Sequence, residues 1–188
     1  MRARMLIALA TVAGCGQASG GPPGRLGLGR EMSAHEIAAF DRDVGPDGVG
    51  LPPGRGTVAE GTTLFAAKCA SCHGTVGQGM PPAYPELIGR PANAEGFRFG
   101  SEPSLDRTIG NYWPYATTVF DYVRRAMPQL TPGSLTDNEV YALTAYLLSA
   151  NDVIPKDATL DAESLPKVRM PYRDRFVPDN RRGGREVK

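Results

Sequence analysis

The pentapeptide Cys69-Ala70-Ser71-Cys72-His73 has residue types and a spacing that can do chemistry, and it forms the pattern C-x-x-C-H. This pattern is typical of c-type haem attachment, in which two thiols bond to the porphyrin and the next histidine is the proximal iron ligand. We therefore predict that Cys69 and Cys72 hold one covalent haem c and that His73 binds its iron.

Paired cysteines have two other common uses. A zinc site needs two further cysteine or histidine ligands, and the chain has only three cysteines and two histidines. A thioredoxin-like pair needs a preceding strand and a following helix, and does not require the histidine. Haem attachment is the interpretation that gives both cysteines and the histidine a role.

Composition limits the class of protein. The 188 residues are 41% hydrophobic and carry a net charge of +1, which predicts one small domain with extensions and argues against a nucleic-acid partner. Many of the 23 glycines and 17 prolines lie before residue 57 or after residue 150. The packable core is therefore small, and a haem would add apolar surface to it.

Residues 1–15 have the features of an export signal: Arg2 and Arg4, then an apolar run, then small residues. The run is too short to span a membrane. Val12-Ala13-Gly14-Cys15 resembles a bacterial lipoprotein signal, although ordinary cleavage nearby is the alternative. We expect a periplasmic protein anchored by lipid on Cys15, with residues 16–56 as a flexible tether and N-terminal arm.

Three capping-box patterns predict helix starts, at Ser33, Thr57 and Thr136. We expect these helices to run through Phe40, through Cys69 and toward Ala150. A fourth helix is predicted over residues 116–126, with Pro114 near its first turn. Gly61 favours a close crossing between the second helix and the last one.

The sixth iron ligand is expected to be Met127, which follows the 116–126 helix and precedes Pro128. A thioether suits haem iron and raises its reduction potential relative to a second imidazole. Met80 is too near His73 to reach the opposite face easily, and Met170 is expected outside the core. These two methionines, or an open site, remain the alternatives, and His35 at a helix start is a weaker candidate.

The order of motifs over residues 57–150 resembles the class I cytochrome c family. It comprises a helix, C-x-x-C-H, Pro85-x-Leu87-x-Gly89-Arg90, a Met-Pro pair and a capped last helix with Tyr146. The resemblance implies a mainly α fold around one haem and assigns three roles: the carbonyl of Pro85 accepts from the proximal histidine, Arg90 lies near a propionate, and Met127 is the distal ligand. Trp113 is counted among the cofactor-binding residues on the same basis.

Over roughly residues 28–188 the chain is more closely similar to the monohaem, SoxD-like cytochrome subunit of the Sox sulfane/sulfite dehydrogenase. The matching stretches include residues 77–82, 109–114 and 165–171. The resemblance implies a molybdenum partner of the sulfite oxidase family, with no molybdenum in this chain, and delivery of electrons to a downstream cytochrome or oxidase. The alternatives are a general periplasmic electron shuttle or, less favoured, a haem enzyme or gas sensor.

With both axial positions filled, the iron would have no site for a substrate, so we expect electron transfer and no catalytic site of the chain's own. The proline-punctuated segment 151–188 is expected to be an arm, either a tail that is solvated or lies on the core, or a docking segment for a partner. On the docking interpretation, deleting it should leave the haem site intact.

Overall fold

The structure is a computed structural model that describes residues 28–89 and 107–179. The chain divides into two units, residues 1–38 and 39–188. The predictions for the export signal, Cys15 and Arg90 lie outside the described residues. Within the described ranges, every helix is too short or too polar to cross a membrane.

The predicted first helix is present as α1 (Ala34–Phe40), and none of its residues is buried. The Ser33 hydroxyl accepts a hydrogen bond from the Glu36 backbone N–H at 3.3 Å, and the Glu36 carboxylate accepts from the Ser33 N–H at 2.9 Å. This reciprocal pair is the capping box that the sequence predicts. His35 lies in this helix and is exposed.

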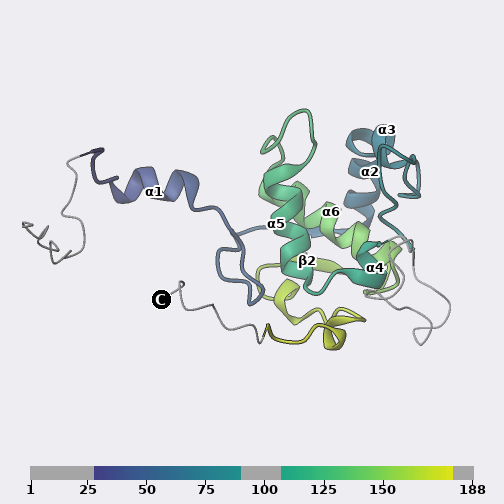
Figure 1. Cartoon of the computed structure of the whole chain (residues 1–188). Coiled ribbons are helices and arrows are strands. Elements are labelled where there is room, and N and C mark those ends of the chain that lie inside the picture. The colour runs from purple at the N-terminus through teal and green to yellow at the C-terminus, as the bar shows by residue number, and fades with distance from the viewer. Residues whose placement is uncertain (1–27, 90–106, 180–188) are drawn as a thin grey trace, which may run out of the picture. The chain divides into compact units, whose positions relative to one another are not determined.

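The second unit is mainly helical, as predicted. Its helices are α2 (Val58–Lys68), α3 (Ala70–His73), α4 (Ile109–Tyr112), α5 (Ala116–Ala126) and α6 (Asp137–Ala150). Helix α6 packs against both α2 and α5, so it forms the centre of the core (Figure 1). Helix α5 begins two residues after Pro114, with Tyr115 as its N-cap, so the proline precedes the helix.

Capping boxes begin both α2 and α6. The Thr57 hydroxyl accepts from the Glu60 N–H at 3.2 Å, and the Glu60 carboxylate accepts from the Thr57 N–H at 2.8 Å. Thr136 and Glu139 make the same pair of bonds at 3.3 and 2.8 Å. Each box supplies partners for N–H groups that a helix start leaves unpaired.

Gly61 lies where α2 crosses α6, as the sequence predicts. A Cβ at this position would lie 1.9 Å from the Ala142 carbonyl oxygen and 2.7 Å from the Tyr146 Cβ. Beside the crossing, the rings of Phe65 and Tyr146 pack with their centroids 4.8 Å apart. Glycine is therefore required here by the backbone of the opposing helix.

We predict that Gly61→Ala destabilises the protein by about 3 kcal/mol, because a methyl group cannot enter without separating the two helices. Urea unfolding measures the change. Ala66→Leu, on the exposed side of the same helix, is the control and should change stability by less than about 0.5 kcal/mol. Equal midpoints for Gly61→Ala and the wild type would contradict this prediction.

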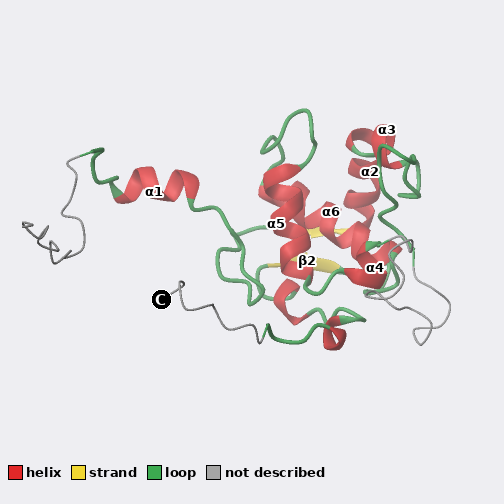
Figure 2. Ribbon diagram, in the orientation of Figure 1, coloured by secondary structure: helices red, strands yellow, loops and turns green. Residues whose placement is uncertain are grey.

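A two-stranded antiparallel ribbon joins the segment before α2 to the segment after α6. Strand β1 (Arg55–Thr57) pairs with β2 (Thr159–Asp161), and Gly56 lies opposite Leu160 (Figure 2). Two 3-10 turns follow, η2 (Leu165–Lys167) and η3 (Arg173–Arg175). The ribbon contacts α6, so the segment after Asn151 is part of the packed structure.

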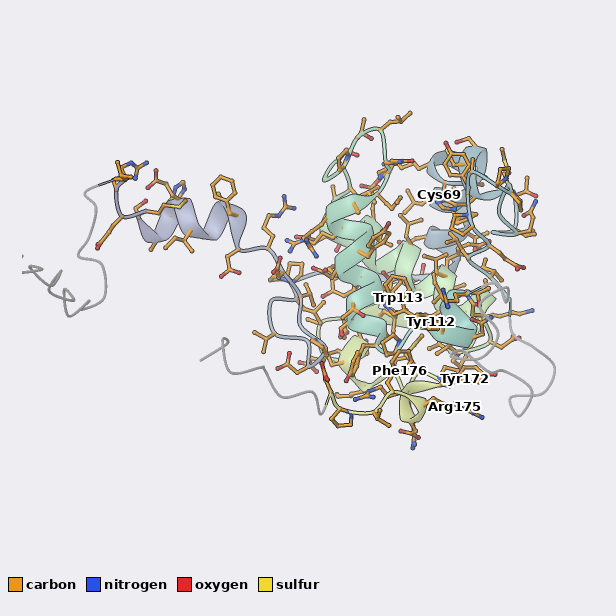
Figure 3. The ribbon with its side chains drawn as sticks, in the orientation of Figure 1. Cys69, Tyr112, Trp113, Tyr172, Arg175 and Phe176 are labelled. Atoms are coloured by element: carbon orange, nitrogen blue, oxygen red, sulfur yellow. The ribbon has the colours of Figure 1, made fainter. Side chains whose placement is uncertain are left out.

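The C-terminal segment lies on the core and contributes to it. Leu160, Leu165, Met170 and Tyr172 are all buried. The expectation that Met170 lies outside the core is therefore wrong, because the ribbon and its turns bring this segment back against α5 and α6. Phe176 meets the ring of Tyr112 edge-on at 5.5 Å, in the aromatic group labelled in Figure 3.

Asp121 on α5 ties the segment before β1 to the helical core. Its carboxylate accepts from the Val44 backbone N–H at 2.9 Å and from the Arg125 guanidinium at 2.9 and 2.5 Å. Burial raises the pKa of Asp121, but these hydrogen bonds lower it by more, so the net pKa lies below its usual value. The ionised form is thus the one the fold stabilises.

We predict that Asp121→Asn lowers stability at pH 7 by about 1–2 kcal/mol, since it removes the charge from these bonds. A depressed folded pKa stabilises above the unfolded value, about 3.9, and that contribution is lost as pH falls through the folded pKa. Urea titrations at pH 7 and pH 3 should therefore show the difference from wild type shrinking at the lower pH. Asp174→Asn, in an exposed pair with Arg169, is the control, and a pH-independent difference at Asp121 would refute the prediction.

Candidate haem site

The C-x-x-C-H motif forms a single helical turn, α3, directly after α2. The N–H groups of Cys72 and His73 donate to the Cys69 carbonyl at 3.1 and 2.9 Å. Gly74 ends the turn at φ +77°, which favours glycine, and its N–H donates to the Ala70 carbonyl. This turn holds Cys69, Cys72 and His73 on the wall of one cavity.

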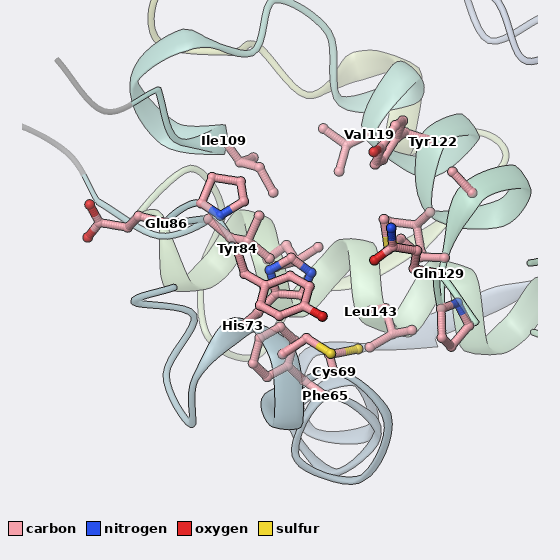
Figure 4. A pocket seen from close by; sticks show the side chains of 18 of the residues that line it. Phe65, Cys69, His73, Tyr84, Glu86, Ile109, Val119, Tyr122, Gln129 and Leu143 are labelled. Carbon is pink, nitrogen blue, oxygen red and sulfur yellow. The ribbon is translucent and has the colours of Figure 1, made fainter. Parts of the chain in front are cut away.

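The cavity has a volume of about 660 Å³, within the usual range for cofactor and ligand pockets of roughly 300–1,000 Å³. Cys69, His73 and Tyr84 lie on one side, across from Val119 and Tyr122 of α5 (Figure 4). Buried apolar side chains from four helices complete the lining: Phe65, Ile109, Val119, Val123, Leu143 and Leu147. An apolar planar ring system suits this lining.

His73 carries an unsatisfied polar atom. Among the described side chains, its Nδ1 is the one buried nitrogen or oxygen atom without a hydrogen-bond partner. Burial lowers the pKa of His73, and the backbone of Pro85 partly offsets this. A neutral imidazole is the form that ligates a metal through one nitrogen and donates from the other, so His73 fits an iron ligand.

The two thiols are free and lie in this same cavity. Burial raises the pKa of the Cys69 thiol to about 11, whereas redox-active cysteine pairs have lowered thiol pKa values. Within the described part of the chain, no three histidine, cysteine or acidic side chains gather as a metal site. The surroundings therefore fit neither a zinc site nor a thioredoxin-like pair, and they fit covalent haem.

Met127 lies at the end of α5, and its N–H donates to the Val123 carbonyl at 3.2 Å. Of the described methionines, it is the one that lines the cavity. Met80 is 46% exposed on a loop, and Met170 is buried in the core but does not line the cavity. The structure thus places His73, the two cysteines and Met127 on the lining of one cavity.

Pro85 and Trp113 also line the cavity. The Trp113 indole N–H donates to the Thr118 hydroxyl at 2.8 Å, and its ring meets Tyr122 edge-on at 5.8 Å. Lys68, at the end of α2, reaches the same cavity and pairs with Glu139 at 2.7 Å. The Lys68 ammonium holds the pKa of Glu139 below its usual value.

Sequence reasoning missed several cavity residues. Val119, Tyr122, Val123 and Ala126 all line the cavity, and their spacing of three and four positions is a helical face that could have revealed them. Ile109 comes from α4, in a region that had no assigned structure. The signal there was Thr108-x-x-Asn111, a capping box with asparagine at its last position. The Thr108 hydroxyl accepts from the Asn111 backbone N–H at 3.2 Å, and the Asn111 side-chain oxygen accepts from the Thr108 backbone N–H at 2.8 Å.

Comparison with known proteins shows to which family a chain with this arrangement belongs. The model of the cytochrome c family matches residues 58–151, which include the motif, the cavity helices and Met127. The chain belongs to the cytochrome c family. As a cytochrome c, it carries covalently bound haem c and transfers electrons.

Two known proteins are similar to this cytochrome c. One chain in the crystal structure of the sulfane dehydrogenase SoxCD from Paracoccus pantotrophus is 44% identical, with a TM-score of 0.71, and the match covers 83% of this chain and 73% of that one. A thiosulfate dehydrogenase from Stutzerimonas stutzeri (strain A1501) is 29% identical over 125 residues, which are 64% of this chain. The matched region spans only 36% of that enzyme's length.

Proposed function

We propose that this cytochrome c accepts electrons from a sulfur-oxidising dehydrogenase, as a monohaem subunit of a sulfane or sulfite dehydrogenase. The observation that carries the proposal is the cavity, with the cysteines and His73 on one wall and Met127 at the end of α5. The 44% identity to a SoxCD chain supports the sulfur substrate.

Four cavity residues have a definite part in this proposal. Cys69 and Cys72 would hold the haem, and His73 and Met127 would bind its iron. Bound haem supplies one-electron exchange between ferric and ferrous iron. Met127 follows α5 and His73 lies in the turn that follows α2, and both α2 and α5 pack against α6. This packing would hold the two ligands in place in either oxidation state, and the apolar lining would exclude water.

The donor in this proposal is a molybdenum subunit of the sulfite oxidase family, which would carry the sulfur chemistry. Electrons would then pass to a downstream cytochrome or oxidase. The SoxCD match covers 83% of this chain, whereas the family domain spans only residues 58–151, so the likeness extends beyond that domain. This supports a dedicated partner over a general shuttle.

We also propose that the protein is exported to the periplasm and anchored by lipid on Cys15. The support is sequence alone: the charged and apolar start, and Val12-Ala13-Gly14-Cys15. Labelling cells with a radioactive fatty acid, with Cys15→Ser as the control, tests the anchor. Label on both proteins, or on neither, would contradict it.

The function is tested by isolating the tagged holoprotein from its native host and determining the copurifying subunits and their metal. The copurified dehydrogenase is then mixed with sulfite, or with a protein-bound sulfane, and haem reduction is followed by absorbance. We expect a molybdenum subunit that reduces the haem only when the sulfur donor is present. Copurification of a molybdenum-free dehydrogenase, or reduction that does not depend on the sulfur compound, would favour the general shuttle.

A further inference from the structure

Asn151, at the end of α6, has a side chain whose hydrogen-bonding positions are all occupied. The haem site described above gives this residue no role. It is 2% exposed. Its Oδ1 accepts from the N–H groups of Gly89 at 3.0 Å and Gly110 at 3.1 Å. Its Nδ2 donates to the carbonyls of Leu87 at 3.2 Å and Leu147 at 2.8 Å. A carboxamide has two donors and two acceptor positions, so every one is occupied.

These bonds join three segments that are far apart in the sequence. Leu147 belongs to α6, Gly110 to the first turn of α4, and Leu87 and Gly89 to the proline-rich loop after the haem motif. A loop without helix or strand depends on such contacts for its position, because it has no backbone ladder of its own. Asn151 thus connects this loop to both α4 and α6.

The same loop is bound from its other sides. The Leu87 carbonyl also accepts from the Ile109 N–H at 3.1 Å, and the Thr108 hydroxyl donates to the Gly89 carbonyl. The Leu87 N–H donates to the Gly77 carbonyl at 2.9 Å, which connects the loop to the turn just after His73. Leu87 is therefore held between Asn151 and the backbone that follows the histidine.

Pro85 is two residues before Leu87 and lines the same cavity as His73, and the ring of its neighbour Tyr84 has its centroid 6.0 Å from that of His73. The Pro85 backbone raises the pKa of His73, although the buried Nδ1 makes no hydrogen bond of standard geometry in this structure. In metal sites, the carbonyl that accepts from the free nitrogen of a ligand histidine fixes the ring and raises its basicity. We propose that Asn151 is a positioning residue for the iron: it holds residues 87–89 and thereby keeps the Pro85 carbonyl beside His73. This rests on the proposed role of His73 as proximal ligand.

Loosening this loop should change the reduction potential of the iron, which a loss of protein stability alone would not do. A carbonyl farther from Nδ1 accepts more weakly, so the imidazole donates less electron density to the iron and stabilises ferric iron less. The reduction potential then moves to a more positive value. The Nδ1 proton should also exchange with solvent faster, because the hydrogen bond proposed between Nδ1 and the Pro85 carbonyl in the holoprotein would open more often.

The experiment compares holoproteins carrying Asn151→Ala or Asn151→Leu with the wild type. Voltammetry measures the reduction potential, and nuclear magnetic resonance of the ferrous protein measures exchange of the His73 Nδ1 proton. We expect a more positive potential and exchange about tenfold faster, equivalent to about 1.4 kcal/mol. The alanine variant leaves room for water at the freed groups, so it answers the question even where the leucine variant does not fold.

Thr144→Val is the matched control. Thr144 is on the same helix, is 0% exposed, and donates to the Val140 carbonyl at 2.7 Å without touching the loop. The Thr144→Val variant should destabilise the protein but leave the reduction potential and the exchange rate of the His73 Nδ1 proton at their wild-type values.

Wild-type readouts in Asn151→Ala, or equal changes in Thr144→Val, would overturn the positioning role. A wild-type protein whose mass lacks covalent haem would instead contradict the proposed function, and that measurement does not involve Asn151.

Discussion

Replacing Met127 with alanine is expected to remove the sixth iron ligand and open the iron to external ligands. Met127 is the one described methionine that lines the cavity, so no other described thioether is placed to take over. The weak absorption band of methionine bound to ferric iron should disappear. The ferrous variant should bind carbon monoxide, and its reduction potential should fall because a thioether ligand raises it.

Met80→Ala is the control for this change. Met80 is 46% exposed, and its backbone pairs with Tyr84 in a loop bridge, so its side chain is not needed in the cavity. We expect this variant to keep the absorption band and to exclude carbon monoxide. A band that persists in Met127→Ala would show that another group ligates the iron, and carbon monoxide binding by the wild type would favour the gas-sensor or haem-enzyme alternative.

Ending the chain after Asn151 is expected to prevent stable folding. The deletion removes strand β2 and the buried side chains of Leu160, Leu165, Met170 and Tyr172. Burial of each contributes about 1.5–3 kcal/mol. Together this is about 6–12 kcal/mol, against a total stability of about 5–15 kcal/mol for a typical protein. The truncation that was expected to leave the haem site intact should therefore lose it.

Circular dichroism during thermal unfolding tests the truncated protein. A point-substitution pair refines the result: Leu165→Ala, at 0% exposure, should cost about 2–5 kcal/mol, whereas Val177→Ala, at 84% exposure, should change stability little. A truncated holoprotein that unfolds at the wild-type temperature would show that the C-terminal segment is not needed for stable folding. It would also restore the docking interpretation as the sole role of that segment.

The sequence predicted features whose cause is local. A capping box needs two side chains three positions apart, so the starts of α1, α2 and α6 could be predicted from Ser33, Thr57 and Thr136. The C-x-x-C-H spacing likewise carries its chemistry within five residues. Even the helix crossing was predictable at Gly61, because a glycine inside a helix is unfavourable unless packing requires it.

Other features depend on contacts between residues far apart in the chain, and no local pattern reports them. Met170 was expected outside the core, yet pairing of β2 with β1 brings its segment against the helices. Asn151 looks like an ordinary helix end in the sequence. Its structural role comes from hydrogen bonds to Leu87, Gly89 and Gly110, which are 64, 62 and 41 positions away in the sequence.

By itself, the sequence determined where the main helices begin, and it predicted which residues attach and ligate a haem. The tertiary structure decided that Met127, rather than Met80 or Met170, shares the cavity with His73. It also decided that the C-terminal segment belongs to the core and that Asn151 fixes the loop beside His73. The physical reason is that spacing encodes bonds within one turn, whereas burial and hydrogen bonds between segments exist only once the chain has folded.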